Sequence, residues 1–200
     1  MVSVWKLKND HKFLEDQKMR TMLKIMKMPK NKIPKDKLDI FENIIQKYYV
    51  PNSGSVEGDI MFMEAMGEQL TEEQRFRLFE QNGGCRGFSH EKERKAFALK
   101  HKDKTLSEKL KLYLNTFGDQ TRDAVLNKKN KTITVKFACN GCYKRIHTAS
   151  VITNYEHCAG GRLDNLQTAL GIKLKIKSVD ISALSENIEK PCVFIFGIME

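Results

Sequence analysis

The stretch DAVLNKKNKTITVKFAC, residues 123–139, decides the fold because the hydrophobic pattern changes there from helical to strand-like. Ile133, Val135 and Phe137 alternate with polar residues, which predicts a strand with one buried and one exposed face. The sequence NKKN at 127–130 favours a turn. The whole stretch is therefore predicted to form a β-hairpin.

Two further strands and a helix are predicted after this hairpin. Residues 158–170 have leucines at helical spacing and end at Gly171. The segment IKLKIKSV at 172–179 alternates between apolar residues and lysine, as a half-exposed strand does. The segment CVFIFGIM at 192–199 is apolar throughout, which predicts a strand in the interior of the sheet that is covered on both sides.

Helices are predicted before the hairpin. The segment LTEEQRFRLFEQNGG at 70–84 has Thr71 and Gln74 in the spacing of a capping box. The segment TLSEKLKLYLNTFG at 105–118 repeats this pattern, and a charged helix is expected between Glu91 and Leu99. The order α, β, β, α, β, β predicts an α+β fold, a mainly antiparallel four-stranded sheet packed with helices.

The first fifty residues differ in character from the rest. Apolar residues have helical spacing over 10–28 and 36–49, and PNSGSVEG at 51–58 is rich in residues that break helices and strands. We expect a helical N-terminal arm over 1–54 and an α+β core domain over 55–200. The methionines of the arm are expected to pack in a core or an interface, so the arm offers a route to a homo-oligomer.

The net charge of +10 and the pI near 9.3 raise the question of a nucleic-acid partner. Lysine dominates the basic residues, without the interleaved arginines and aromatics of most nucleic-acid modules. Nucleic acid is therefore an unlikely partner, and solvated lysine is the preferred interpretation. The alternative is a lysine-rich arm that docks on an acidic partner or on nucleic acid.

Membrane and secretory signals are not evident in the sequence. The first twenty residues lack the apolar region of a signal peptide, and CVFIFGIM is too short to span a bilayer. Five cysteines are an odd number, which fits reduced thiols better than a disulfide framework. We expect a cytoplasmic protein with no membrane partner.

The stretch FACNGCYKRIHTASVITNYEHCAGG, residues 137–161, is the most specific candidate for a site. Cys139 and Cys142 form a CxxC pair at the end of a predicted strand, where the glycine permits a tight turn. Cys158 lies at the predicted start of a helix, which lowers the pKa of a thiol and favours the metal-binding thiolate. Three thiolates could thus meet at one end of the sheet and bind a metal, with zinc as the expected ion.

The fourth ligand is sought among the remaining cysteines and histidines. Cys85 is the first choice because it follows the flexible sequence QNGG, whereas His147 and His157 are weaker candidates for metal or ligand binding. Cys192 is expected in the core. Two alternatives remain open: plain reduced or buried thiols, and a redox dithiol or nucleophile. Catalytic residues are not assigned.

The C-terminal half also resembles a known group of proteins. From YLNTFG through FACNGC and HCAGG to LGIKLKIKSVDISALSENIEKPCVFIFGI, it is similar to an uncharacterised bacterial protein family. It is more distantly similar to 4-vinyl reductase-like ligand-binding domains and to the L-2-amino-thiazoline-4-carboxylate hydrolase-like family. The resemblance implies helices packed on an antiparallel sheet, with a small-ligand or metal site near the cysteines.

These observations favour a protein that binds a metal, zinc first, or a small ligand through a cysteine cluster. The alternative is a cysteine- or zinc-dependent hydrolase of a small heterocycle or amide, which would need a base near the thiol or an open coordination position on the metal.

Overall fold

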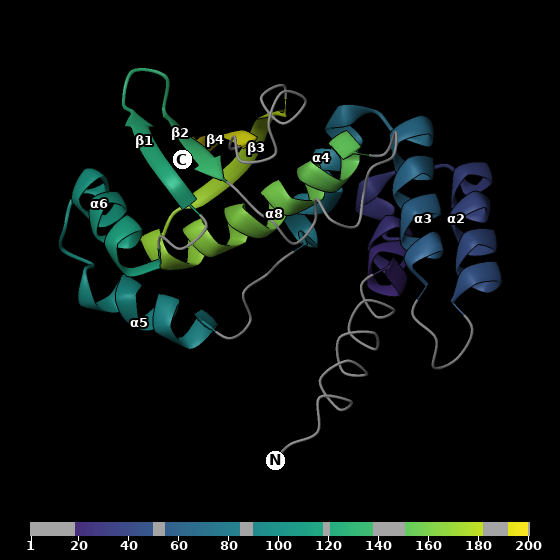
Figure 1. The fold of residues 1–200 in the computed structure, drawn as a ribbon, viewed down its shortest axis with the longest axis horizontal. Coiled ribbons are helices and arrows are strands. Elements are labelled where there is room, and N and C mark those ends of the chain that lie inside the picture. Colours follow the sequence, from purple (N-terminus) through teal and green to yellow (C-terminus); the bar gives the residue numbers. More distant parts are fainter. Residues whose placement is uncertain are drawn as a thin grey trace, which may run out of the picture. The chain divides into compact units, whose positions relative to one another are not determined.

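The computed structural model describes residues 19–49, 55–84, 90–117, 121–137, 151–181 and 192–199. Contacts within the chain group it into two compact units, residues 1–82 and 83–200. Figure 1 shows the helices and strands, which in chain order are η1 (Pro29–Asn31), α2 (Lys35–Tyr48), α3 (Val56–Gln69), α4 (Glu72–Gln81), α5 (Glu91–Lys100), α6 (Leu106–Phe117), β1 (Thr121–Asn127), β2 (Thr132–Phe137), α8 (Val151–Leu170), β3 (Lys173–Asp180) and β4 (Cys192–Met199).

The first unit is helical throughout its described part. Residues 19–26 form a helix before η1, and α2, α3 and α4 follow. Phe41 of α2 contacts Phe62 of α3, with ring centroids 5.0 Å apart. Met22 and Met26 are buried, so these methionines pack in a core as expected. The expected boundary between residues 54 and 55 adjoins residues 50–54, which lie outside the described part, and it stays a prediction.

Local sequence signals set the ends of two helices. Thr71 accepts a hydrogen bond from the N–H of Gln74, whose side chain accepts one from the N–H of Thr71, so the predicted capping box of α4 is confirmed. Thr105 and Glu108 make the same pair of contacts before α6. These bonds satisfy backbone donors that a helix leaves unpaired at its start.

The second unit carries the sheet, and the predicted α+β fold is confirmed. The strand order is β1-β2-β4-β3, and all three neighbouring pairs are antiparallel. The predicted hairpin joins β1 to β2, and its turn is stabilised by the Asn127 side chain, which accepts a hydrogen bond of 3.0 Å from the N–H of Asn130. The register is irregular near Thr121 in β1 and between Ile176 and Ser178 in β3.

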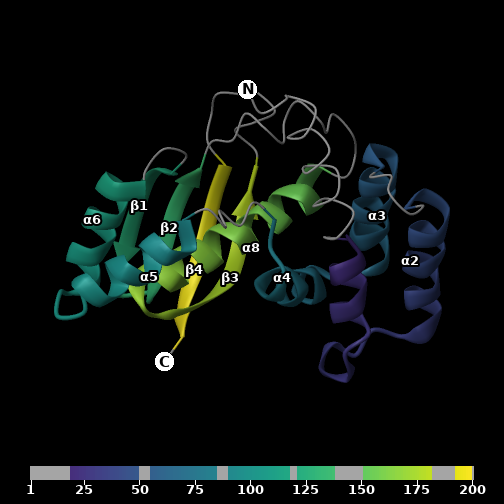
Figure 2. The same ribbon diagram turned by 90° about the horizontal axis from the view of Figure 1, so that it is seen from below.

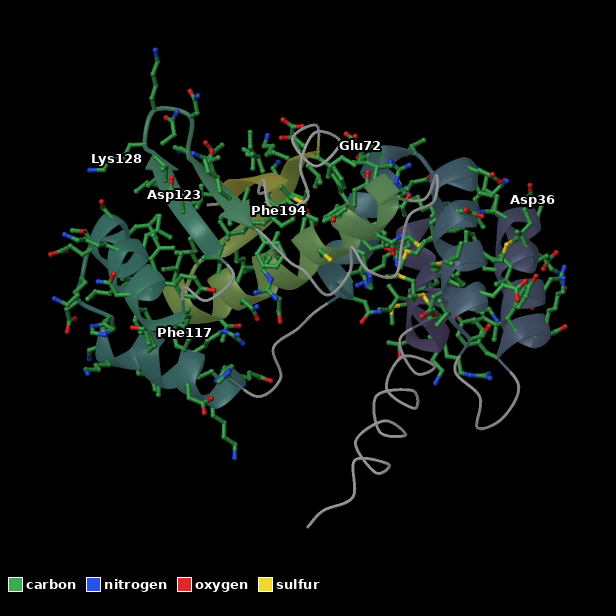
Figure 3. The ribbon with its side chains drawn as sticks, viewed as in Figure 1. Asp36, Glu72, Phe117, Asp123, Lys128 and Phe194 are labelled. Carbon is green, nitrogen blue, oxygen red and sulfur yellow. The ribbon has the colours of Figure 1, made fainter. Side chains whose placement is uncertain are left out.

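One face of the sheet is packed against α8, as Figure 2 shows from below. On this face Phe194 of β4 lies opposite Val135 of β2, and both are fully buried. Figure 3 shows Phe194 between the sheet and α8. The residues of α8 with the spacing of a sheet-facing stripe are all at most 2% exposed: Ala159, Leu163, Leu166 and Leu170.

The other face of the inner strands is only half-buried, which corrects the expectation for β4. β4 is an interior strand as predicted, but Val193 and Ile195 are only half-buried, so the strand is not covered on both sides. An antiparallel sheet tolerates one solvated face. The aliphatic part of a lysine side chain covers some of this face. Lys177 of β3 lies over Gly197 of β4, since a Cβ atom on Gly197 would be 2.8 Å from Cε of Lys177.

The helix α8 begins earlier than the sequence suggested. The predicted helix covered 158–170, whereas α8 covers 20 residues from Val151. The apolar residues Ile152 and Tyr155 continue the stripe of Ala159 towards the N-terminus, and the Gly160–Gly161 pair does not interrupt the helix. Cys158 therefore lies two turns inside α8. The prediction that it sits at a helix start is wrong, and that argument for a lowered thiol pKa does not apply.

Candidate functional site around helix α8

Helix α8 presents three faces with different chemistry. Successive residues of an α-helix are rotated by about 100°, so residues three or four apart share a face. The leucine stripe faces the sheet. Residues 157, 160 and 161 lie on a second face, and Cys158, Arg162 and Asn165 lie on a third. His157 and Cys158 are neighbours in sequence and thus point in different directions.

The second face of α8 receives the segment at Gly83 and Gly84. The N–H of Gly84 donates a hydrogen bond of 2.8 Å to the carbonyl oxygen of His157. A Cβ atom on Gly83 would lie 2.1 Å from the carbonyl carbon of Gly160 and from the nitrogen of Gly161. A Cβ atom on Gly84 would lie 2.8 Å from Nδ1 of His157. Only glycine permits this approach, and it brings two distant glycine pairs together.

The thiol and the imidazole of this region are buried. Cys158 is 3% exposed and His157 is 8% exposed, and both make further interactions in the protein. Glu156 and Thr153 are also buried. A buried polar group requires partners, and Glu156, His157 and Cys158 all have interactions within the protein.

Several predicted site residues lie outside the described part of the chain: Cys85, Cys139, Cys142 and His147. Within the described ranges, no group of three or more His, Cys, Asp or Glu side chains is arranged to hold a metal ion. Cys192 is 1% exposed and pairs with Phe137 across the sheet, so its place in the core is confirmed.

The third face of α8 meets charged and aromatic side chains that the sequence reasoning missed. Arg162 of α8 lies over the ring of Phe137 in β2, with Cζ 4.5 Å from the ring centroid. Arg94 of α5 is 7% exposed, and its Cζ lies 5.8 Å from the ring centroid of Phe117 in α6. The signal available in the sequence was the spacing of Arg94 and Phe97, which places an arginine on the inward face of α5.

Tyr113 of α6 connects the two arginines. Its side chain is 2% exposed, and burial raises the pKa of its hydroxyl. The charges of Arg162 and Arg94 oppose that rise in the pKa of Tyr113, as does a hydrogen bond with Arg94.

Comparison with known proteins identifies no related family, protein or structure. No protein-family model matches the chain, and no curated protein or solved structure matches it significantly. The resemblance of the C-terminal half to the uncharacterised bacterial family stays a prediction. Among the helices that the structure describes, none has the length and apolar character needed to cross a bilayer.

Proposed function

We propose that this protein is a binding module that holds a zinc ion or a small ligand through a cysteine cluster that includes Cys158 of α8. The observation that supports the proposal is the contact of Gly83 and Gly84 with Gly160, Gly161 and His157, the residue that precedes Cys158. Cys85 follows Gly84 directly in the chain, so the contact brings the segment that leads to Cys85 against the helix that carries Cys158.

The chemistry of this region suits a soft cation or a thiol-binding ligand. Cys158 is 3% exposed, so a thiolate there would need a compensating partner such as a bound metal ion. Zinc takes thiolate and imidazole ligands in tetrahedral sites. The proposed ligand set is Cys85, Cys139, Cys142 and Cys158, with His157 and His147 as substitutes.

Metal analysis of the untagged, purified chain tests the zinc form of the proposal. We expect about one zinc ion per chain, as for one four-ligand site. Cys158→Ser and Cys85→Ser should each lose most of the metal. Cys192→Ala is the matched control, because its sulfur belongs to the core of the sheet, and it should keep the metal.

Native mass spectrometry tests the small-ligand form. A mass excess that is lost in Cys158→Ser, in the absence of metal, supports a small ligand. A chain that carries neither metal nor a mass excess overturns both forms and leaves plain thiols.

A further inference from the structure

The sheet of the second unit has a face that points away from α8, and we call it the open face. Figure 1 shows α5 and α8 together on the opposite side of the strands. On the open face, Val193 and Ile195 of β4 are half-buried, and Val125 of β1 is 54% exposed. The register places Val125 and Ile195 on either side of Thr134. The centre of the open face is therefore a partly exposed apolar surface that crosses three strands.

Lysine side chains of β3 lie over one part of the open face. Lys175 pairs with Gly197 of β4, and the pairing then passes from Ile176 to Ser178, so Lys177 is an extra residue of β3. A Cβ atom on Gly197 would lie 2.8 Å from Cε of Lys177 and 3.4 Å from Cγ of Lys175. The missing side chain of this glycine thus leaves room for two lysine stems beside the apolar centre.

The charges of these lysines are not neutralised within the described part of the chain. Lys173, Lys175 and Lys177 are all exposed, and none of them forms an ion pair with a described residue. Lys136 of β2 differs, because Asp123 lies 3.9 Å from its ammonium group. The β3 side of the open face is therefore positively charged and can accept an acidic partner.

Helix α3 of the first unit has the complementary chemistry. Its 14 residues include four acidic side chains and no basic one. Met61, Glu64 and Glu68 are three or four residues apart, so they share one side of the helix. Met61 is 37% exposed, and neither glutamate forms an ion pair with a described residue. A different side of α3 carries its buried residues, among them Phe62 and Met66.

We propose that the open face binds helix α3 of a second copy of this chain. The glutamates of α3 lie against the lysines of β3, and Met61 packs on the apolar centre. At about 1.5 Å per residue α3 is roughly 21 Å long, and four strands about 4.8 Å apart give a face of similar width. The helix thus fits on the face without bending.

The chemistry of the open face favours this occupant over nucleic acid. The described side chains of the face include no aromatic ring, so the bases of a single strand would have no surface on which to stack. The apolar centre, in contrast, suits an amphipathic helix. The proposal uses no cysteine, so it stands or falls separately from the metal proposal.

Sedimentation velocity of the full chain tests the proposal over a series of chain concentrations. We expect reversible self-association at low ionic strength. Added sodium chloride should favour the monomer, because salt screens the exposed charges of lysine and glutamate. A chain that stays monomeric at every concentration in low salt overturns the proposal.

Two charge-reversed variants identify the two surfaces. The sheet variant is Lys175→Glu with Lys177→Glu, and the helix variant is Glu64→Lys with Glu68→Lys. Each should weaken self-association at least about tenfold, because each sets like charges against each other. Lys175→Gln with Lys177→Gln removes the same charges, should weaken association less, and serves if the sheet variant does not fold.

An equimolar mixture of the sheet and helix variants separates contact between copies from effects within one chain. The sheet variant keeps the acidic α3 and the helix variant keeps the basic β3, so the mixture restores one original contact. We expect mixed association although neither variant associates alone. Lys92→Glu with Lys100→Glu, at exposed positions of α5, is the matched control and should associate like the original chain. A mixture that stays monomeric, or a control that loses as much affinity as the sheet variant, would overturn the proposal.

Discussion

Gly83 contacts the bare backbone of Gly160: a Cβ atom at residue 83 would lie 2.1 Å from the carbonyl carbon of that helical glycine. This separation is far below a van der Waals contact, so no side chain fits there without movement of the backbone. The glycine pair of α8 thus allows the backbone at Gly83 and Gly84 to approach the helix closely.

Gly83→Ala should therefore loosen the segment before Cys85. We expect a loss of roughly 1–3 kcal/mol in the free energy of unfolding, as for other overpacked sites. The amide hydrogen of Gly84, which is bonded to His157, should exchange faster. Gly171→Ala is the control: its φ of +67° makes it strained, but nothing lies within 4 Å of its Cβ position. Unchanged protection of the Gly84 amide in Gly83→Ala would contradict this account.

The one-sided cover of the sheet predicts unequal costs for neighbouring residues of β4. Phe194 is fully buried against α8, and Phe194→Ala should cost about 3–5 kcal/mol in urea unfolding because it leaves a cavity. Ile195 points to the half-exposed face, so Ile195→Ala should cost much less. Equal losses for the two variants would show that both faces are covered.

The capping box of α4 predicts a moderate effect at an exposed residue. Thr71→Ala removes the acceptor for the N–H of Gln74 and should lower the free energy of unfolding of the first unit by about 1 kcal/mol. Thr71→Ser keeps the hydroxyl and should remain near the original stability. Urea unfolding followed by circular dichroism measures both, and equal losses would mean that the cap contributes nothing.

The pKa of His101 should lie below its ordinary value of 6.5. Partial burial disfavours the charged ring, and Lys100, Lys104 and Lys109 repel it. The folded state then binds fewer protons than the unfolded state, so the contribution of His101 to stability is present above pH 6.5 and is lost as the pH falls through the folded pKa. NMR titration of the ring measures the pKa, and Lys109→Gln should raise it. A pKa at or above 6.5 would contradict the prediction.

Much of the fold could be predicted because its signals are local. The alternation of Ile133, Val135 and Phe137 set one face of β2, and the Thr71 and Gln74 pair set the start of α4. The sequence predicts the start of α8 seven residues too late, because the cysteine motif suggests a helix that begins at Cys158. Ile152 and Tyr155 have the spacing that continues the apolar stripe of the helix towards Val151.

The candidate site depends on contacts that the sequence does not display. Arg94 and Arg162 look like ordinary surface arginines in the sequence, and only the structure shows that Arg94 is buried and that Arg162 lies over the Phe137 ring. The approach of Gly83 to Gly160 likewise joins residues that no local pattern connects.

The lysines of β3 also bear on how copies of this chain meet in solution. β3 is an edge strand, and Lys173, Lys175 and Lys177 occupy its exposed positions beside a register irregularity. A strand from another copy that docked along this edge would set like charges against each other on a backbone that is not regular. Fibril-like assembly through β3 is thus opposed by repulsion, and this protection weakens as added salt screens the ammonium groups.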